Sequence, residues 1–327
     1  ATEELSLSLS RLWPATDEEM DEAVLFAQDE AFRNGVIWVH EMGDAAGWAA
    51  LQRASRAGRL RLWVSQFFRC EGRDALRTLS SFVPPKEAPY LSFAGIKLFL
   101  DGSIGARTAA VREPYPGGEP TYGTLVWEDR DLDEALRICI RNDWKVAAHA
   151  IGDRALEQFV SALERTDYPP NSTPRVEHAE MLPDDLYERS VRRGVLFSMQ
   201  PNFTANWQGP GGLYEQTLGP ERARALNPFA KVDPSRLLFG SDHMPLDPRY
   251  GIQGAMGHPD PEQRLSRAAA LDAYTEVHFR STWSHFGGLI DSAQPASFVI
   301  VSDDGAGTDI LATTEFGKLA YLAEGSA

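Results

Sequence analysis

The chain has 327 residues, of which 43% are hydrophobic, 10% aromatic and 24% charged. This globular composition excludes wholesale disorder, and the length favours two domains or one α/β barrel of roughly 250 residues. The net charge of −15, from 47 acidic and 32 basic residues, repels phosphate backbones and anionic membranes. We therefore expect neither nucleic acid nor a membrane as a partner.

The cationic residues are mostly arginine, because the chain has few lysines. The lysines are Lys86, Lys97, Lys145, Lys231 and Lys318. An acidic, lysine-poor surface is what the acidic proteome of a high-salt cytoplasm favours, and a GC-rich genome rich in arginine codons explains it equally well. Cys70 and Cys139 are too few for a disulfide framework or a thiolate metal site. With no signal-peptide pattern and no apolar run near ~20 residues, we expect a cytoplasmic protein.

The N-terminal part of the chain alternates between helical patterns and apolar runs. Thr16 as N-cap with Glu19 three residues later predicts a helix over residues 17–33. The elements expected next are a strand at 36–39, a helix at 45–57, a strand at 60–68, a helix at 73–82 and a strand at 95–100. A Gly- and Pro-rich excursion over residues 114–123 then interrupts the pattern.

The alternation continues beyond this excursion. The expected elements are a helix at 131–143, a strand at 145–149, a helix at 153–165, a strand at 175–178, a helix at 183–193 and a strand at 196–200. An irregular stretch over 201–233 precedes a strand at 237–240 and a final helix at 261–279. Residues 297–301 and 319–322 predict antiparallel strands of a small appended β unit.

Strands that alternate with helices of this length indicate βαβ units and a parallel sheet. About seven strands come close to the eight of a barrel. We predict an α/β fold, a distorted (β/α)8 TIM barrel that is incomplete if no eighth strand is supplied. The barrel domain is expected to cover residues 1–285, and a C-terminal β unit residues 286–327.

Polar residues fall where the predicted strands end. His149, His178 and Asp242 each lie at or just beyond the C-terminal end of a strand, and Lys97 lies inside another. In a (β/α)8 barrel these ends meet on one face, and nitrogen and carboxylate ligands suit Zn²⁺ or a similar divalent ion. Either histidine alone reads as a hydrogen-bonded structural residue, but the joint placement predicts a metal site. His40 also follows a predicted strand, where a turn explains it equally well.

Lys97 needs a separate explanation, because a protonated ammonium repels a bound cation. The side chain could react with CO₂ to give a carbamate that bridges two metals. It could instead form a Schiff base with a carbonyl substrate, or act as an ion-pair partner near the barrel mouth.

Four segments carry a resemblance to a known family. They are Gly95-Ile-Lys-Leu-Phe-Leu-Asp-Gly-Ser-Ile-Gly-Ala-Arg-Thr-Ala109, Ala148-His-Ala-Ile-Gly-Asp-Arg-Ala155, Arg175-Val-Glu-His-Ala179 and Phe239-Gly-Ser-Asp-His-Met-Pro245. In this order, over roughly residues 14–275, the chain resembles the YtcJ-like branch of the amidohydrolase superfamily. Such proteins are metal-dependent hydrolases of C–N bonds in amides and related groups, built on a distorted barrel with an appended β-sandwich.

The resemblance implies a role for each of the four polar residues. Lys97 would be the carbamylated bridging ligand, and His149 and His178 would bind the second metal. Asp242 would ligate the first metal and act as the catalytic general base on the bridging water. Arg107, His243 and Trp207 are candidates for contacting a small-molecule substrate; a solvated arginine and simple loop packing explain Arg107 and Trp207 equally well.

One feature of the family is absent from the sequence. Family members carry a His-x-His pair at the end of the first barrel strand, and this sequence contains no His-x-His. A complete binuclear centre therefore cannot form from these residues alone, and we expect either a fragment of a longer product or a degenerate relative with one metal or none. A missing strand also exposes sheet edges, which are covered by residues 1–12, by a partner chain or not at all, so self-association into a homo-oligomer is one hypothesis.

Three functions follow from these observations. The first is a metal-dependent amidohydrolase that acts on a non-peptide C–N bond through an activated water. The second is a non-catalytic or single-metal relative in which the ligand residues persist. The third is a Schiff-base lyase that uses Lys97.

Overall fold

The computed structural model describes residues 15–71, 74–281, 288, 290–292, 294–303 and 308–324. The chain divides into two compact units, which are described separately. The first comprises Ala1–Phe68, Pro84–Phe93 and Ser297–Ala327, and the second comprises Arg69–Val83 and Ala94–Ala296. The predicted domain boundary at 285/286, like the N-terminal cover expected from residues 1–12, lies outside the described residues.

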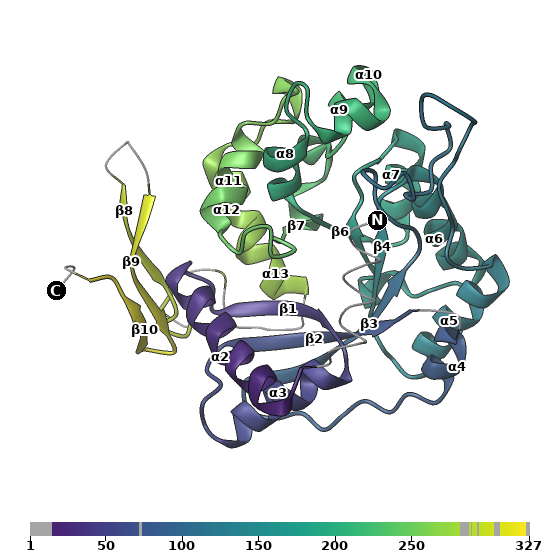
Figure 1. The fold of residues 1–327 in the computed structure, drawn as a ribbon. Coiled ribbons are helices and arrows are strands. Elements are labelled where there is room, and N and C mark those ends of the chain that lie inside the picture. Colours follow the sequence, from purple (N-terminus) through teal and green to yellow (C-terminus); the bar gives the residue numbers. More distant parts are fainter. Residues whose placement is uncertain are drawn as a thin grey trace. The chain divides into compact units, whose positions relative to one another are not determined.

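The second unit is built on parallel strands that pair in the order of the sequence (Figure 1). These are the end of β3 (Leu91–Phe99), then β4 (Val146–Ala150), β5 (Arg175–His178), β6 (Leu196–Met199) and β7 (Leu237–Phe239). The helices α4 (Ala75–Ser80), α5 (Asp129–Arg141), α6 (Asp153–Arg165) and α7 (Asp184–Arg192) lie between strands in the sequence, together with the 3-10 turn η1 (Pro170–Ser172). Parallel neighbours need such crossover helices, because a tight turn cannot join them.

The first unit holds the two strands that open the sheet. They are β1 (Trp38–Gly43) and β2 (Trp63–Cys70, of which residues 63–68 belong here), preceded by α2 (Asp17–Arg33) and α3 (Ala45–Arg56). The full strand order is β1-β2-β3-β4-β5-β6-β7. The predicted α/β fold of the barrel type is therefore confirmed in topology, and the described residues supply seven parallel strands.

A small antiparallel sheet completes the first unit. Its strands are β8 (Val299–Asp303), β9 (Thr308–Glu315) and β10 (Lys318–Leu322), in the order β10-β9-β8. The Thr313 hydroxyl donates to the Phe32 carbonyl at 2.7 Å, which joins the sheet to the end of α2. The predicted C-terminal β unit is confirmed, and β9, which the sequence did not indicate, is its central strand.

The region after β6 corrects the sequence prediction. The expected irregular stretch at 201–233 contains α8 (Pro201–Trp207), α9 (Leu213–Leu218), α10 (Pro220–Arg224) and the 3-10 turn η2 (Phe229–Lys231), and a further 3-10 turn, η3 (Pro234–Arg236), follows it. Another helix, α11 (Pro248–Met256), was also not predicted. Proline occupies the first turn of α8, α10 and α11, where its fixed φ and missing N–H are tolerated.

The expected helix over 261–279 is broken in the structure. It consists of η4 (Pro261–Gln263), α12 (Arg267–Tyr274) and α13 (Glu276–Ser281). Thr275 has φ −123° and ψ −86°, outside the helical region, and this residue separates α12 from α13. No helix in the described ranges is long and apolar enough to cross a membrane.

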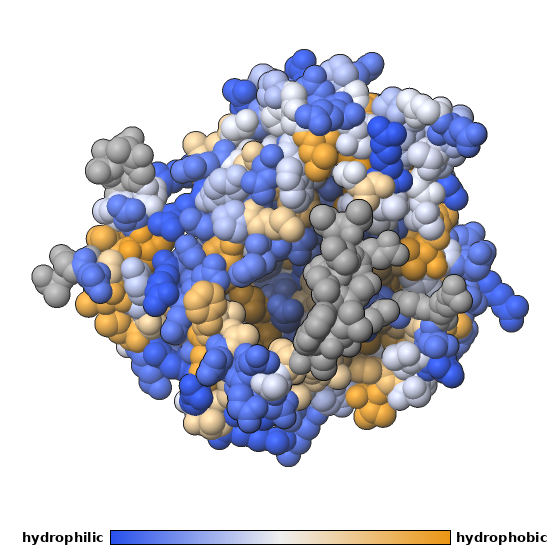
Figure 2. Space-filling model, in the orientation of Figure 1, coloured by the Kyte–Doolittle hydropathy of each residue, from blue (hydrophilic) through white to orange (hydrophobic). Residues whose placement is uncertain are grey.

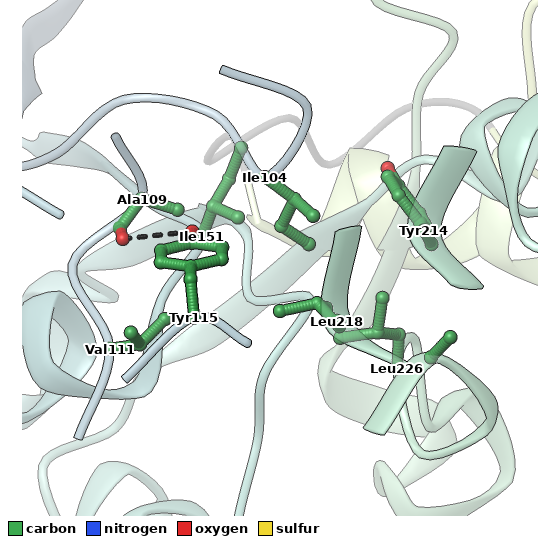
Figure 3. Close-up of a cluster of buried hydrophobic side chains, with 9 residues drawn as sticks. Ile104, Ala109, Val111, Tyr115, Ile151, Tyr214, Leu218 and Leu226 are labelled. Carbon is green, nitrogen blue, oxygen red and sulfur yellow. Dashed lines mark hydrogen bonds between the residues drawn. The ribbon is translucent and has the colours of Figure 1, made fainter. Parts of the chain in front are cut away.

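A buried cluster fixes the long loop after β3 against the helices that follow β6 (Figure 3). The Tyr115 hydroxyl donates to the Ala109 carbonyl at 3.0 Å, so the loop also bonds to itself. The cluster comprises Ile104, Ala109, Val111, Tyr115, Ile151, Tyr214, Leu218, Ala223 and Leu226. Because Ile104 and Ile151 follow β3 and β4, the cluster holds the loop close to the ends of the strands that carry the predicted site residues.

Candidate active site

The strand register places Lys97 and His149 on one face of the sheet. Lys97 on β3 pairs with Ala147 on β4. His149 lies two residues after Ala147 on β4, and it pairs with Phe99 on β3 and with Glu177 on β5. Side chains two residues apart point to the same face of a strand. Lys97, His149 and Glu177 therefore share that face, so the structure brings the first two together as the sequence predicted.

His178 joins this group by a departure from regular strand geometry. As the neighbour of Glu177 it would point to the opposite face, but its φ is +76° and that of Ala179 is +46°. The left-handed conformation turns the chain at the end of β5, and the rings of His178 and His149 lie 4.5 Å apart at 70°. Such conformations cost of order 1–3 kcal/mol for non-glycine residues and cluster at functional sites.

The contacts of the His149 ring define its tautomer. Its Nε2 lies 3.0 Å from the Gly102 carbonyl and 3.3 Å from Asp101 Oδ1. Both neighbours are acceptors, so Nε2 carries the proton in the neutral ring and Nδ1 keeps a lone pair. The ring is largely buried beside Phe99, with centroids 5.6 Å apart.

His178 has the opposite arrangement. Its Nδ1 lies 2.8 Å from Gln200 Oε1, so Nδ1 donates and Nε2 keeps the lone pair. The ring stacks on Phe203 at 5.6 Å and 11°. Burial, followed by the charges of His149 and Lys97, places the pKa of His178 well below its usual value. The imidazole is therefore neutral at pH 7, the form that binds metals.

Lys97 is buried, at 3% exposure, and its charge acts on the pKa of His178. Burial lowers the pKa of Lys97 to about 8, while the charges of Glu177 and Asp242 act in the opposite direction. Its ammonium lies 5.1 Å from the Phe99 ring centroid. Since a depressed pKa raises the fraction of neutral amine, the environment of Lys97 suits a reactive lysine.

Glu177 is a buried acid that the sequence prediction missed. Burial alone would raise its pKa, but Arg175, whose Nη2 lies 2.9 Å from Oε1, and Lys97 together hold the pKa below its usual value. Because side chains alternate between the two faces of a strand, the position of Glu177 next to Val176 on β5 could have indicated that its side chain faces inward. The residues that Glu177 meets there depend on the strand register, which the sequence does not give. The sheet thus carries an ionised carboxylate next to Lys97.

Asp242 lies in the turn after β7, where it and His243 both adopt left-handed backbone, with φ of +46° and +56°. Asp242 is exposed to solvent. Loss of water around the carboxyl raises its pKa, and the charges of Lys97 and His149 oppose this effect. Asp242 is therefore close enough to both residues to interact electrostatically with them.

The donor chemistry of these residues fits a divalent metal. His149 Nδ1 and His178 Nε2 keep lone pairs while the opposite nitrogens are held by acceptors, the pattern typical of metal-ligating imidazoles. Asp242 adds a carboxylate near Lys97 and His149. Within the described ranges, no three His, Cys, Asp or Glu side chains already converge at metal-binding distances. The two imidazoles and the carboxylate thus offer donor types that suit a divalent metal.

The candidate substrate residues occupy different settings. Arg107 is exposed, has φ +56° and donates its backbone N–H to Ile104 O at 2.9 Å. His243 is exposed beside Asp242. Trp207 packs against Phe203 at 4.7 Å and against the buried cluster of Figure 3. This packing explains Trp207 without any substrate.

His40 corrects one expectation. The predicted turn at residues 40–43 does not form, because β1 continues to Gly43. His40 therefore lies within a strand, and its ring meets Phe67 edge-on at 6.3 Å. It belongs to the first unit and has no established role in the site.

The sequence profile described as the amidohydrolase family matches residues 2–314. The chain belongs to the amidohydrolase family. Among individual proteins it is similar to YtcJ of Bacillus subtilis (strain 168), with 27% identity over 91% of this chain and 59% of that protein. It is also similar to LONG AFTER FAR-RED 3 of Arabidopsis thaliana, with 25% identity over 93% of this chain and 58% of that protein.

Solved structures give the same result. An uncharacterized metal-dependent hydrolase from Pyrococcus furiosus superimposes with a TM-score of 0.78 and 29% identity, over 90% of this chain and 62% of that chain. A second one, from Pyrococcus horikoshii OT3, gives a TM-score of 0.75 and 29% identity over 87% and 60%. The chain thus spans about 60% of the length of each of these four relatives. The resemblance stated from the four sequence segments is confirmed.

Proposed function

We propose that this chain carries the catalytic residues of a metal-dependent amidohydrolase that cleaves a non-peptide C–N bond of a small molecule. The observation that carries the proposal is the pair of adjacent imidazoles, His149 and His178, each with one nitrogen held by an acceptor and the other turned away from that acceptor. Family membership supports a hydrolase, and the nitrogen and carboxylate donors favour Zn²⁺. Without His-x-His in the sequence, the proposal is limited to one metal.

Each residue has a distinct task in this proposal. A bound divalent metal would supply Lewis-acid polarisation of the scissile carbonyl and lower the pKa of a water molecule. Asp242, whose pKa is raised, accepts the proton of the attacking water and passes it to the leaving amine. Lys97, with a pKa of about 8, holds roughly a tenth of its amine neutral at pH 7, the form that reacts with CO₂ to give a carbamate.

The substrate contacts are also part of the proposal. Arg107 and His243 are exposed near the ends of β3 and β7, where they could hold the polar groups of an amide substrate. Trp207 would form an apolar wall. The cytoplasmic location and self-association inferred from the sequence remain proposals alongside them.

Metal content tests the proposal directly. Protein purified without chelators should contain about one divalent metal per chain, and the double variant His149→Ala/His178→Ala should contain none. Asp242→Ala should reduce hydrolysis of small amides by about 10²–10⁴-fold, as expected for a lost general base. Asp131→Ala, an exposed acid on α5, is the matched control and should keep both metal and activity. A metal content near zero contradicts the proposal, and a value near two contradicts the single-metal assignment.

The depressed pKa of Lys97 favours one alternative, a Schiff-base lyase. In that case borohydride would trap a carbonyl substrate on Lys97, and chelators would leave activity unchanged. The hydrolase instead loses activity with chelator and gives no trapped adduct. The second alternative, a non-catalytic or single-metal relative, predicts one bound metal or none, and in its non-catalytic form no turnover of any amide.

A further inference from the structure

Asp101, the second residue after β3, has a fully buried carboxylate with four polar neighbours. Its Oδ2 accepts backbone N–H bonds from Ala110 at 2.9 Å and Gly152 at 2.8 Å. Its Oδ1 accepts from the backbone of Ile151 at 3.1 Å and lies 3.3 Å from His149 Nε2. These donors come from two separate segments, the loop after β3 and the turn after β4. Asp101 therefore joins both segments to the ring of a proposed metal ligand.

The backbone around Asp101 leaves little freedom for rearrangement. At Gly152 a β-carbon would lie 1.9 Å from the Ala110 carbonyl oxygen, so the loop and the turn are in direct contact. Both segments are also anchored in the buried cluster, through Ile104 and Ile151. A carboxylate held by three backbone donors in such a frame cannot rotate to follow His149. The ring must therefore adapt to the carboxylate.

We propose that Asp101 is a positioning residue that locks His149 in the Nε2–H tautomer and so presents Nδ1 to the metal. The Gly102 carbonyl at 3.0 Å adds a second acceptor at the same nitrogen. In the alternative Nδ1–H tautomer, Nε2 would carry a lone pair instead of a proton. That lone pair would point at two acceptors, the Asp101 carboxylate and the Gly102 carbonyl, and neither could donate a hydrogen bond to it. The part of the inference that concerns metal binding rests on the proposed function. The part that concerns the tautomer rests on the structure alone.

The variant Asp101→Asn tests this role. The amide oxygen is best placed at the Oδ2 position, where Ala110 and Gly152 donate, so the NH₂ group replaces Oδ1 beside His149 Nε2. That group donates, and it favours the Nδ1–H tautomer. Removing such an outer partner typically costs 10–100-fold in metal affinity. Asp153→Asn is the matched control, because Asp153 accepts the Arg112 backbone N–H at 2.8 Å and no described contact joins it to His149.

The readout is the ¹⁵N spectrum of this chain, histidine-labelled and without metal, with the His149 signal assigned by His149→Gln. Wild type and Asp153→Asn should show the Nε2–H tautomer, and Asp101→Asn should show a shift toward Nδ1–H. Zn²⁺ titration should give 10–100-fold weaker binding for Asp101→Asn alone. An Nδ1–H tautomer in the wild type overturns the inference, whether or not the variant folds. So does a folded Asp101→Asn with unchanged tautomer and affinity.

The two proposals fail in different ways. If the wild type binds no Zn²⁺, the proposed function fails, while the tautomer of the metal-free protein still decides the role of Asp101. If Zn²⁺ binds normally and Asp101→Asn changes nothing, the proposed function stands and the positioning role is wrong.

Discussion

Burial decides which protonation states the residues around Lys97 adopt. It lowers the pKa values of Lys97 and His178, and the charges of Arg175 and Lys97 keep Glu177 ionised despite its burial. The result is a neutral imidazole beside an ionised carboxylate and a lysine that titrates near pH 8. A carbamate on Lys97 would place a further negative charge between Glu177 and Asp242, and a cation would have to compensate for it.

His278 provides a pH-dependent prediction for stability. Burial lowers its pKa to about 4, and its Nε2–H donates to the Phe239 carbonyl at 2.8 Å. An unfolded histidine titrates near 6.5, so between pH 6.5 and 4 the unfolded chain binds a proton that the folded chain does not. The stabilisation is complete above pH 6.5 and is lost as the pH falls toward 4. The slope is at most about 1.4 kcal/mol per pH unit, and less here because the ring is partly exposed.

The variant His278→Gln separates this effect from other titrations. Glutamine keeps an N–H donor for the Phe239 carbonyl and does not titrate. Urea unfolding at several pH values should show that wild type loses about 1–2 kcal/mol more than the variant between pH 6.5 and 4. Parallel stability curves for the two proteins would show that His278 does not carry the effect.

At the scale of elements, glycine at the start of α6 has a steric role. Gly152 is its N-cap, and a β-carbon there would lie 1.9 Å from the Ala110 carbonyl oxygen. Because that neighbour is backbone, it cannot rotate away. The turn between β4 and α6 therefore depends on glycine for its contact with the loop after β3.

Gly152→Ala should accordingly destabilise the protein by about 1–3 kcal/mol, the range for forced overpacking. Gly209→Ala is the control, because nothing lies within 4 Å of its would-be β-carbon and its φ is not positive. Chemical denaturation measures both variants. Equal stability of Gly152→Ala and the wild type would mean that the loop can withdraw, contrary to the contact seen here.

Local signals explain which elements the sequence could predict. The helix over 17–33 was predicted in full, because its capping box lies within four residues: Thr16 N–H donates to Glu19 Oε2 at 2.8 Å, and Glu19 N–H donates to Thr16 Oγ1 at 3.2 Å. The helix α6 and the strand β5 were also predicted at their observed bounds. In each case hydrophobic periodicity and flanking residues suffice.

Elements that depend on distant partners could not be predicted in this way. The strand β9 alternates poorly, and its conformation is set by pairing with β8 and β10 on both sides. The same limit holds for the site. Strand ends pointed to His149, His178 and Asp242, and an apolar strand pointed to Lys97, whereas the role of Asp101 depends on contacts with residues up to 51 positions away. Residue type and spacing do not encode such contacts.

At the scale of the whole molecule, the first unit draws on both ends of the described chain. The Thr313–Phe32 hydrogen bond joins residues 281 positions apart, and Trp63 Nε1 donates to Glu315 Oε1 at 3.3 Å across 252 positions. Sequence patterns do not reveal contacts between residues so far apart in the chain.

The described part of β8–β10 and its turns also exposes large apolar side chains, some of them visible in Figure 2. They are Phe298, Ile300, Val301, Phe316, Leu319 and Leu322, exposed by 37–54%.

The net charge of −15 should make stability depend on salt. Repulsion among the excess carboxylates destabilises the compact folded state. In 1 M salt the Debye length is about 3 Å, so charges farther apart than this hardly repel each other. Surface ion pairs weaken too, but each contributes at most about 1 kcal/mol. We expect the Tm to rise as NaCl increases from low concentration to 1 M. In the triple variant Glu22→Gln/Asp29→Asn/Glu119→Gln, which removes three exposed negative charges, that rise should be smaller. A Tm that falls with salt, or an identical response of the variant, would show that repulsion does not limit stability.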